Sequence, residues 1–306
     1  HSHALGSPER TIDVRYVPNA KVALTNDVPF NVYDSSYTPN ERIILNPSKG
    51  YFVQRGLITF MTNGRTGYLS LYGGSIEGGV AVGPDNKSGD AWFQSYAGCN
   101  FRLAGKPVNL PGTLTLDNAG TFSISSTGNK WGGLRVNKSV LTCEVDDALC
   151  EIGALLFCMP GQGAIQSADY GCRLYGAVNL AGHGQTVSRM TNAWDIANDS
   201  NPAFVDCRAI VDSATPAAIT VTGAQDGNNL RTEFRRAAGL TMAGTGTLRF
   251  TKWISPTCGR LEVRSGELAF AAGGGWGGGT NTATVAVTGG TLSVAADAAE
   301  TAFGGA

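Results

Sequence analysis

The stretch GTLTLDNAGTFSI, residues 112–124, decides the fold class of this chain. It contains two copies of one five-residue phrase, Gly-x-Φ-x-Φ, in which Φ is Val, Ile, Leu, Met or Phe. Glycine tolerates the backbone angles of a tight corner, and the alternation places both Φ side chains on one face of a short strand. Each copy therefore predicts a turn that is followed by a strand with one buried face.

The phrase recurs through most of the 306-residue chain. Roughly two copies are expected by chance from the frequencies of glycine and of the Φ residues, whereas the sequence contains twelve. In the later half of the chain, strand starts fall about 20 to 25 residues apart, which is the length of one coil in a solenoid. The copies begin at Gly56, Gly67, Gly78, Gly112, Gly120, Gly132, Gly153, Gly176, Gly246, Gly259, Gly266 and Gly290.

Short strands with glycine corners favour an all-β parallel solenoid over a hairpin architecture. Asn-Gly and Asp-Gly, the strongest hairpin signals, are few and occur at 63–64 and 226–227. We therefore predict a β-solenoid over residues 51–306. Residues 1–50 contain five of the twelve prolines and no copy of the phrase, so they are predicted to form an irregular, cap-like segment. Residues 144–157 fit helical and strand spacing alike, and Gly153 favours a strand.

Composition narrows the class of protein. Glycine makes up 42 of the 306 residues, and charged residues 15 %, against a usual ~25 %. The net charge of −1, with scattered Lys and Arg, predicts no nucleic-acid partner. No apolar run is long enough to span a membrane. Because the chain starts without methionine and ends within a repeat-like phrase, we expect it to be part of a longer polypeptide.

The last third of the chain resembles the autotransporter-associated β-strand repeat, a family found in bacterial surface and passenger-type proteins. The likeness spans residues 177–305. It rests on AVNLAGHGQTV at 177–187, GLTMAGTGTLRF at 239–250, GRLEVRSGEL at 259–268 and VAVTGGTLSV at 285–294. The resemblance implies a right-handed parallel β-helix, secreted or displayed at the cell surface, that carries no catalytic residues. Such a stalk or adhesin-like segment would meet surface glycans or neighbouring cells.

A catalytic alternative rests on Asp146, Asp147 and His183. Adjacent aspartates with a Gly-His-Gly element are similar to parts of polygalacturonase-like glycosidases, in which two carboxylates act as general acid and base. On one strand, Glu144 and Asp146 would project to the same face about 6.6 Å apart, near the separation that an inverting pair needs. The family's flanking elements are missing, so we expect no catalytic residues and keep a polysaccharide-cleaving β-helix enzyme as the alternative.

Other residues are candidates for sugar-binding and metal sites. Trp131 and Trp276 lie in glycine-rich turns where an indole could stack on a sugar, so a carbohydrate-binding module is a further alternative. Acidic residues at 195, 199 and 206, and the turn at 226–229, keep no calcium-loop spacing. The seven cysteines form no Cys-x-x-Cys pair. We therefore predict neither a metal site nor a cofactor.

Overall fold

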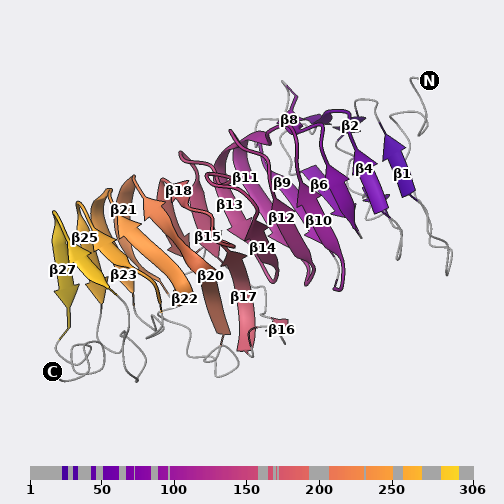
Figure 1. Ribbon diagram of the computed structural model, residues 1–306. Coiled ribbons are helices and arrows are strands. Elements are labelled where there is room, and N and C mark those ends of the chain that lie inside the picture. Colours follow the sequence, from indigo (N-terminus) through magenta and orange to yellow (C-terminus); the bar gives the residue numbers. More distant parts are fainter. Residues whose placement is uncertain are drawn as a thin grey trace.

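The computed structural model describes residues 23–26, 30–33, 43–45, 51–61, 67–71, 73–83, 89–95, 97–157, 165–167, 170, 172–192, 207–230, 232–250, 258–270 and 284–295. Every element in these ranges is a β-strand, as the glycine phrase predicts. The strands stack as a parallel β-solenoid and follow one another in chain order along its length (Figure 1). Within the described ranges, no helix is long and apolar enough to cross a membrane.

Four sheets form the sides of the solenoid. The largest follows the order β1-β4-β7-β10-β12-β14-β17-β20-β22-β24-β26, with β16 beside β17 and β18 beside β20. Its strands are β1 (Ala23–Asn26), β4 (Tyr51–Gln54), β7 (Gly74–Ile76), β10 (Asn100–Leu103), β12 (Thr121–Ile124), β14 (Val140–Cys143), β16 (Ile165–Ser167), β17 (Cys172–Asn179), β18 (Gln185–Val187), β20 (Cys207–Val221), β22 (Thr232–Met242), β24 (Leu261–Val263) and β26 (Val285–Val287).

The other three sheets complete the coils. One contains β3 (Ile43–Leu45), β6 (Gly67–Leu71), β9 (Ala91–Ser95), β11 (Asn109–Asp117), β13 (Lys130–Val136), β15 (Ala154–Phe157) and β19 (Arg189–Asn192). Another contains β2 (Phe30–Tyr33), β5 (Ile58–Met61) and β8 (Val80–Val82). The last contains β21 (Ala224–Leu230), β23 (Thr245–Phe250), β25 (Glu267–Phe270) and β27 (Thr291–Val294).

Parallel pairing begins before the boundary at residue 51 that the sequence predicts. β1 pairs with β4, β2 with β5 and β3 with β6, all in parallel. The first three strands therefore form a coil of the solenoid, although prolines surround them. The absence of the glycine phrase from residues 1–50 did not exclude strands there, because a strand needs the phrase only where its start lies tightly against a neighbouring coil.

The twelve phrases lie on twelve different strands, and their Φ residues build the core. Wherever the side chains are described, both Φ residues of a phrase belong to the apolar core or pack against it. Register aligns them: Leu114 pairs with Leu134, and Leu134 with Leu155, on consecutive coils. Phenylalanines align in the same way, and Phe101 meets Phe122 edge to face with ring centroids 5.6 Å apart. Each fully buried side chain of this size contributes about 1.5–3 kcal/mol.

Close approach of the coils, more than unusual backbone angles, explains the glycines of the phrase. A Cβ atom at Gly78 would lie 2.2 Å from the carbonyl oxygen of Gly56 in the preceding coil. Gly78 does not have a positive φ, so its requirement is steric. Gly246 combines both reasons, because its φ is 75° and a Cβ atom there would lie 2.1 Å from the carbonyl oxygen of Gln225.

Two coils are much longer than the others. Phe101 pairs with Phe122, 21 residues further on, whereas Leu141 pairs with Val178, 37 residues further on. Val178 in turn pairs with Val211, 33 residues further on. The first long coil includes β16, which is antiparallel to β17. Within residues 144–157 only Ala154–Phe157 forms a strand, so the predicted strand is correct after Gly153 and wrong before it.

One corner of the solenoid buries a carboxyl group. Asp117, at the end of β11, is 5 % exposed and accepts a hydrogen bond from Nδ2 of Asn137 at 2.8 Å. Burial raises the pKa of Asp117 above its usual 3.8, although the charge of Lys138 acts in the opposite direction. A raised pKa means that Asp117 contributes stability at low pH, and that this contribution is lost as the pH rises through its folded-state pKa.

The core ladder can be tested at Leu268, which is fully buried between Leu248 and Leu292 in register. Leu268→Asp should abolish cooperative thermal unfolding or cause aggregation, because it places an unpaired charge between two apolar side chains. Leu248→Asp should act alike. Thr245→Asp, at an exposed position of β23, is the matched control and should change Tm little. Normal melting of both leucine variants would contradict the inward assignment.

The buried carboxyl group predicts a pH effect. Asp117→Asn removes the ionisation, so the Tm of the variant relative to the unmodified chain should increase between about pH 4 and about pH 7. Thermal unfolding followed by circular dichroism at several pH values measures this difference. A difference in Tm that is the same at every pH would show that Asp117 titrates normally in the folded chain.

Candidate functional site

Turns of neighbouring coils bring Asp146, Asp147 and His183 together. Asp146 and Asp147 lie in the turn after β14, and His183 lies one coil further on, between β17 and β18. Oδ1 of Asp146 is 3.4 Å from Nδ1 of His183 and accepts a hydrogen bond from the backbone N–H of Gly184 at 2.8 Å. The three residues of the catalytic alternative are thus neighbours, although 37 residues separate Asp146 from His183 in the chain.

The expected pairing of Glu144 with Asp146 is wrong. Both were placed on one strand, but β14 ends at Cys143 and the two residues lie in the following turn. Glu144 forms an ion pair with Arg102 at 2.7 Å. The strand spacing that suggested an inverting pair of carboxylates therefore does not apply.

Asp147 also links the two coils. Its φ is 49°, and its backbone N–H donates to the carbonyl of Gly184 at 2.9 Å. Its Oδ1 accepts a hydrogen bond from the hydroxyl of Thr186 at 3.0 Å. Each aspartate thus uses one carboxylate oxygen to hold the next coil.

The hydrogen bonds of the Gln185 side chain explain why the phrase GHGQTV contains a glutamine. Its side chain is 1 % exposed. Its Oε1 accepts the N–H of Leu149 at 2.9 Å, and its Nε2 donates to the carbonyls of Val145 at 2.8 Å and His183 at 3.3 Å. A buried amide that satisfies three backbone groups closes the turn that carries both aspartates.

Asp146, Asp147 and Gln185 border a groove of about 550 Å³ on the outside of the solenoid. Asp146 and Asp147 lie at one end, and Thr220 and Thr241 form its middle. At the other end Glu262 accepts a hydrogen bond from Arg264 and forms an ion pair with Arg260. The hydrogen bond from Arg264 and the charge of Arg260 lower the pKa of Glu262, so this carboxylate is ionised at neutral pH. The groove therefore presents both charges and uncharged hydroxyl groups.

The tryptophan candidates do not supply an exposed stacking platform in the described chain. Trp131 lies in β13, not in a turn, and is 2 % exposed. A Cβ atom at Gly153 would lie 2.6 Å from its indole ring. The predicted exposure of Trp131 is therefore wrong, because Gly153 in the next coil leaves space for the buried indole. Trp276 lies outside the described residues.

The structure describes only some of the acidic residues considered as calcium ligands. Asp226, in β21, forms an ion pair with Arg189 at 3.3 Å. The residues at 195, 199 and 206 lie outside the described ranges, in which no cluster of three or more His, Cys, Asp or Glu side chains is arranged to hold a metal ion.

Five of the seven cysteines are free thiols in the structure, and the side chains of Cys158 and Cys207 lie outside the described part. The free thiols are Cys99, Cys143, Cys150, Cys172 and Cys258. Cys143 is fully buried, as its place in an alternating strand predicts, and burial raises the pKa of its thiol strongly. A buried thiol with a raised pKa is a poor nucleophile, so Cys143 serves as a small core residue.

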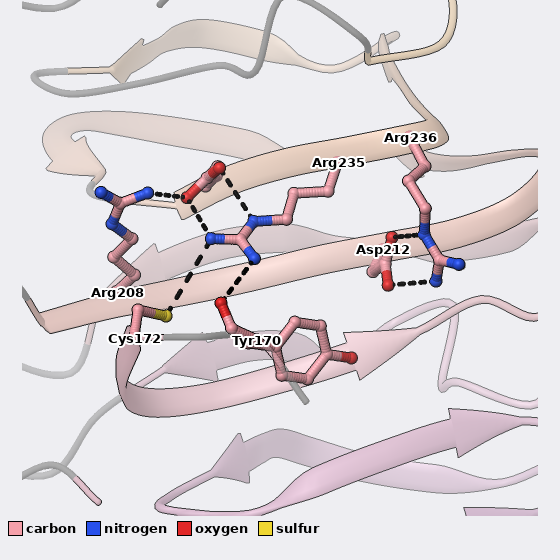
Figure 2. Close-up of polar contacts among 7 residues, drawn as sticks. Tyr170, Cys172, Arg208, Asp212, Arg235 and Arg236 are labelled. Atoms are coloured by element: carbon pink, nitrogen blue, oxygen red, sulfur yellow. Dashed lines mark hydrogen bonds and ion pairs between the residues drawn. The ribbon is translucent and has the colours of Figure 1, made fainter. Parts of the chain in front are cut away.

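A second polar cluster braces the long coils (Figure 2). Arg235, in β22, donates to both carboxylate oxygens of Glu233, at 2.8 and 3.1 Å, and to the carbonyl of Tyr170 at 3.1 Å. Its guanidinium carbon is 5.8 Å from the centroid of the Tyr170 ring. Arg208 donates to the same glutamate at 2.8 Å. Through the hydrogen bond from Arg235 to the Tyr170 carbonyl, the cluster ties the segment between β16 and β17 to a strand two coils away.

Sequence reasoning missed the basic end of the groove. The alternation Arg-Leu-Glu-Val-Arg over 260–264 predicts three outward charged side chains on one strand. The alternation does not reveal that this strand, β24, lies three strands away from Thr186 in the same sheet. That position depends on the successive pairing of β18, β20, β22 and β24.

Gln185 gives a test of how the turn is held. Gln185→Leu keeps the volume but leaves the Leu149 N–H and two carbonyl groups without their partner, so the free energy of unfolding should fall by about 2–4 kcal/mol. Thr186→Val, which removes one exposed hydrogen bond, should cost less than about 1 kcal/mol. Chemical denaturation of both variants measures the difference, and equal losses would contradict the special role of the amide.

The comparisons with known proteins name no relative. A scan of the chain against protein-family models finds no match, and searches of curated proteins and of solved structures find no significant match. The likeness to the autotransporter-associated repeat therefore rests on the phrases at 177–305 alone and stays a prediction.

Proposed function

We propose that this chain is a non-enzymatic β-solenoid segment of a large bacterial secreted or cell-surface protein. It acts as a stalk or adhesin-like surface that meets surface glycans or neighbouring cells. The observation that carries this proposal is the continuous ladder of inward apolar side chains, which runs from β5 to β27 in the described residues.

The ladder suits a mechanical role. Eleven strands lie on the path of the largest sheet, and at a spacing of about 4.8 Å they span about 50 Å. Parallel pairing links each coil to the next by backbone hydrogen bonds, so the rod resists bending and holds its ends apart. A segment of this kind serves as a spacer whose outer surface is free to vary.

The polar residues near the groove support the same proposal. Asp146 and Asp147 each hold the following coil through a side-chain oxygen, and Asp147 also does so through its backbone N–H. One observation favours the enzymatic alternative, a polysaccharide-cleaving enzyme, namely that Asp146, Asp147 and His183 are neighbours. Their hydrogen bonds to the neighbouring coil give them a structural task that does not require catalysis.

Incubation with a panel of plant and bacterial polysaccharides separates the two functions. We expect no new reducing ends and no unsaturated products, because the aspartates act as coil contacts. Turnover that is abolished by Asp147→Asn would overturn the display function. In parallel, antibodies raised against the chain should label intact bacterial cells or the culture medium, and labelling only after permeabilisation would contradict the proposed location.

A further inference from the structure

The groove beside Asp147 runs along the axis of the rod. Its lining comes from five successive coils, from the turn after β14 to β24. At about 550 Å³ it has the size of a small-ligand site. It is open and shallow, so a ligand that fits it is elongated and remains partly in solvent.

Outward threonines form the floor. Thr186 pairs with Thr220, Thr220 with Thr241, and Thr241 with Glu262. Three steps between parallel strands place the two ends of this row about 14 Å apart. Within the described part of the chain, the hydroxyls of Thr220 and Thr241 have no hydrogen-bond partner. Each can therefore donate to and accept from a bound molecule.

Acceptors lie at one end of the row. Asp146 and Asp147 use Oδ1 for the contacts with Gly184 and Thr186. The second oxygen of each carboxylate is left for a ligand, and the Asp146 side chain is 74 % exposed. A carboxylate oxygen accepts hydrogen bonds from hydroxyl groups, and such charge-assisted bonds are stronger than neutral ones.

Donors lie at the other end. Arg260 and Arg264 each contact Glu262 through Nη2, at 3.3 and 3.0 Å. A guanidinium has five N–H donors, so both arginines keep donors that face solvent. Their side chains are 58 % and 56 % exposed. Glu262 fixes the orientation of both groups, which reduces the entropy that a ligand would otherwise have to overcome.

We propose that this groove binds a neutral oligosaccharide chain aligned with the rod. A sugar chain offers hydroxyl groups at regular intervals, and these can donate to the aspartates and accept from the arginines and threonines. The proposal rests on the display function proposed above and names the class of partner that the displayed surface meets.

The composition of the groove disfavours other partners. Three carboxylates and two guanidiniums line it, so a nucleic acid or another polyanion would meet more negative than positive charge. Ala218 is its only apolar lining residue in the described chain, so an apolar peptide segment would lack a hydrophobic contact. Since no aromatic side chain lines it, binding depends on hydrogen bonds, and we expect a Kd between about 10 µM and 1 mM.

The test uses the full chain and soluble hexasaccharides. Neutral oligomers of glucose, xylose, mannose and galactose, and oligomers of uronic acids, are titrated and followed by calorimetry or by ligand-observed NMR. We expect at least one neutral oligomer to bind. Thr220→Val/Thr241→Val should weaken it about tenfold, because two hydroxyl contacts are lost. The matched control Thr245→Val/Thr291→Val alters two exposed threonines of another sheet and should leave Kd unchanged.

Arg264→Gln is a second variant that alters an exposed side chain, and it should also weaken binding. Far-ultraviolet circular dichroism confirms that each variant is folded. The proposal is overturned if no neutral oligomer binds at several millimolar, if only uronic acid oligomers bind, or if both groove variants bind as the unmodified chain does. Product formation in the turnover assay would overturn the display function but leave the groove as a sugar site, so the two failures are distinguishable.

Discussion

The structure depends on one constraint, the separation of about 4.8 Å at which backbone hydrogen bonds hold successive coils. At this distance an inward side chain lies directly on its partner in the next coil, so apolar residues must recur in register. The same distance leaves no space for a Cβ atom where a strand starts against a neighbouring carbonyl, as at Gly78 and Gly259. Glycine corners and aliphatic ladders are therefore two results of one spacing, and their combination gives the phrase Gly-x-Φ-x-Φ.

Turns between the strands cannot use the regular ladder, and buried amide side chains replace it. Asn129 accepts from Val108 N–H and donates to the carbonyls of Ser126 and Ala148. Gln225 accepts from Met190 N–H and donates to two carbonyls. Gln185 does the same beneath the turn that carries Asp146. Each amide satisfies backbone groups that would otherwise be buried without partners, and by fixing the turn it also fixes the rim of the groove.

The solenoid could be predicted from the sequence because its signal is local and repeated. Twelve glycine phrases each specify a turn, a strand and a buried face, and the structure confirms the buried face wherever side chains are described. The site could not be predicted in the same way. The glycines next to Trp131 in the sequence suggest an exposed turn, but the indole is buried, and Gly153 of the next coil makes space for it. Thr220, Thr241 and Arg264 carry no motif, and only the register of parallel strands brings them together.

The two long coils, in which paired positions lie 37 and 33 residues apart in the chain, show that the axial repeat does not depend on the length of the coil. Leu141 still pairs with Val178, and Val178 with Val211, as in the shorter coils. The architecture thus treats two kinds of sequence change differently. Core positions tolerate only conservative substitutions, whereas the segments between strands accept whole insertions. Foreign peptides grafted between β15 and β17 would inherit a defined position on the rod and leave its pitch unaltered.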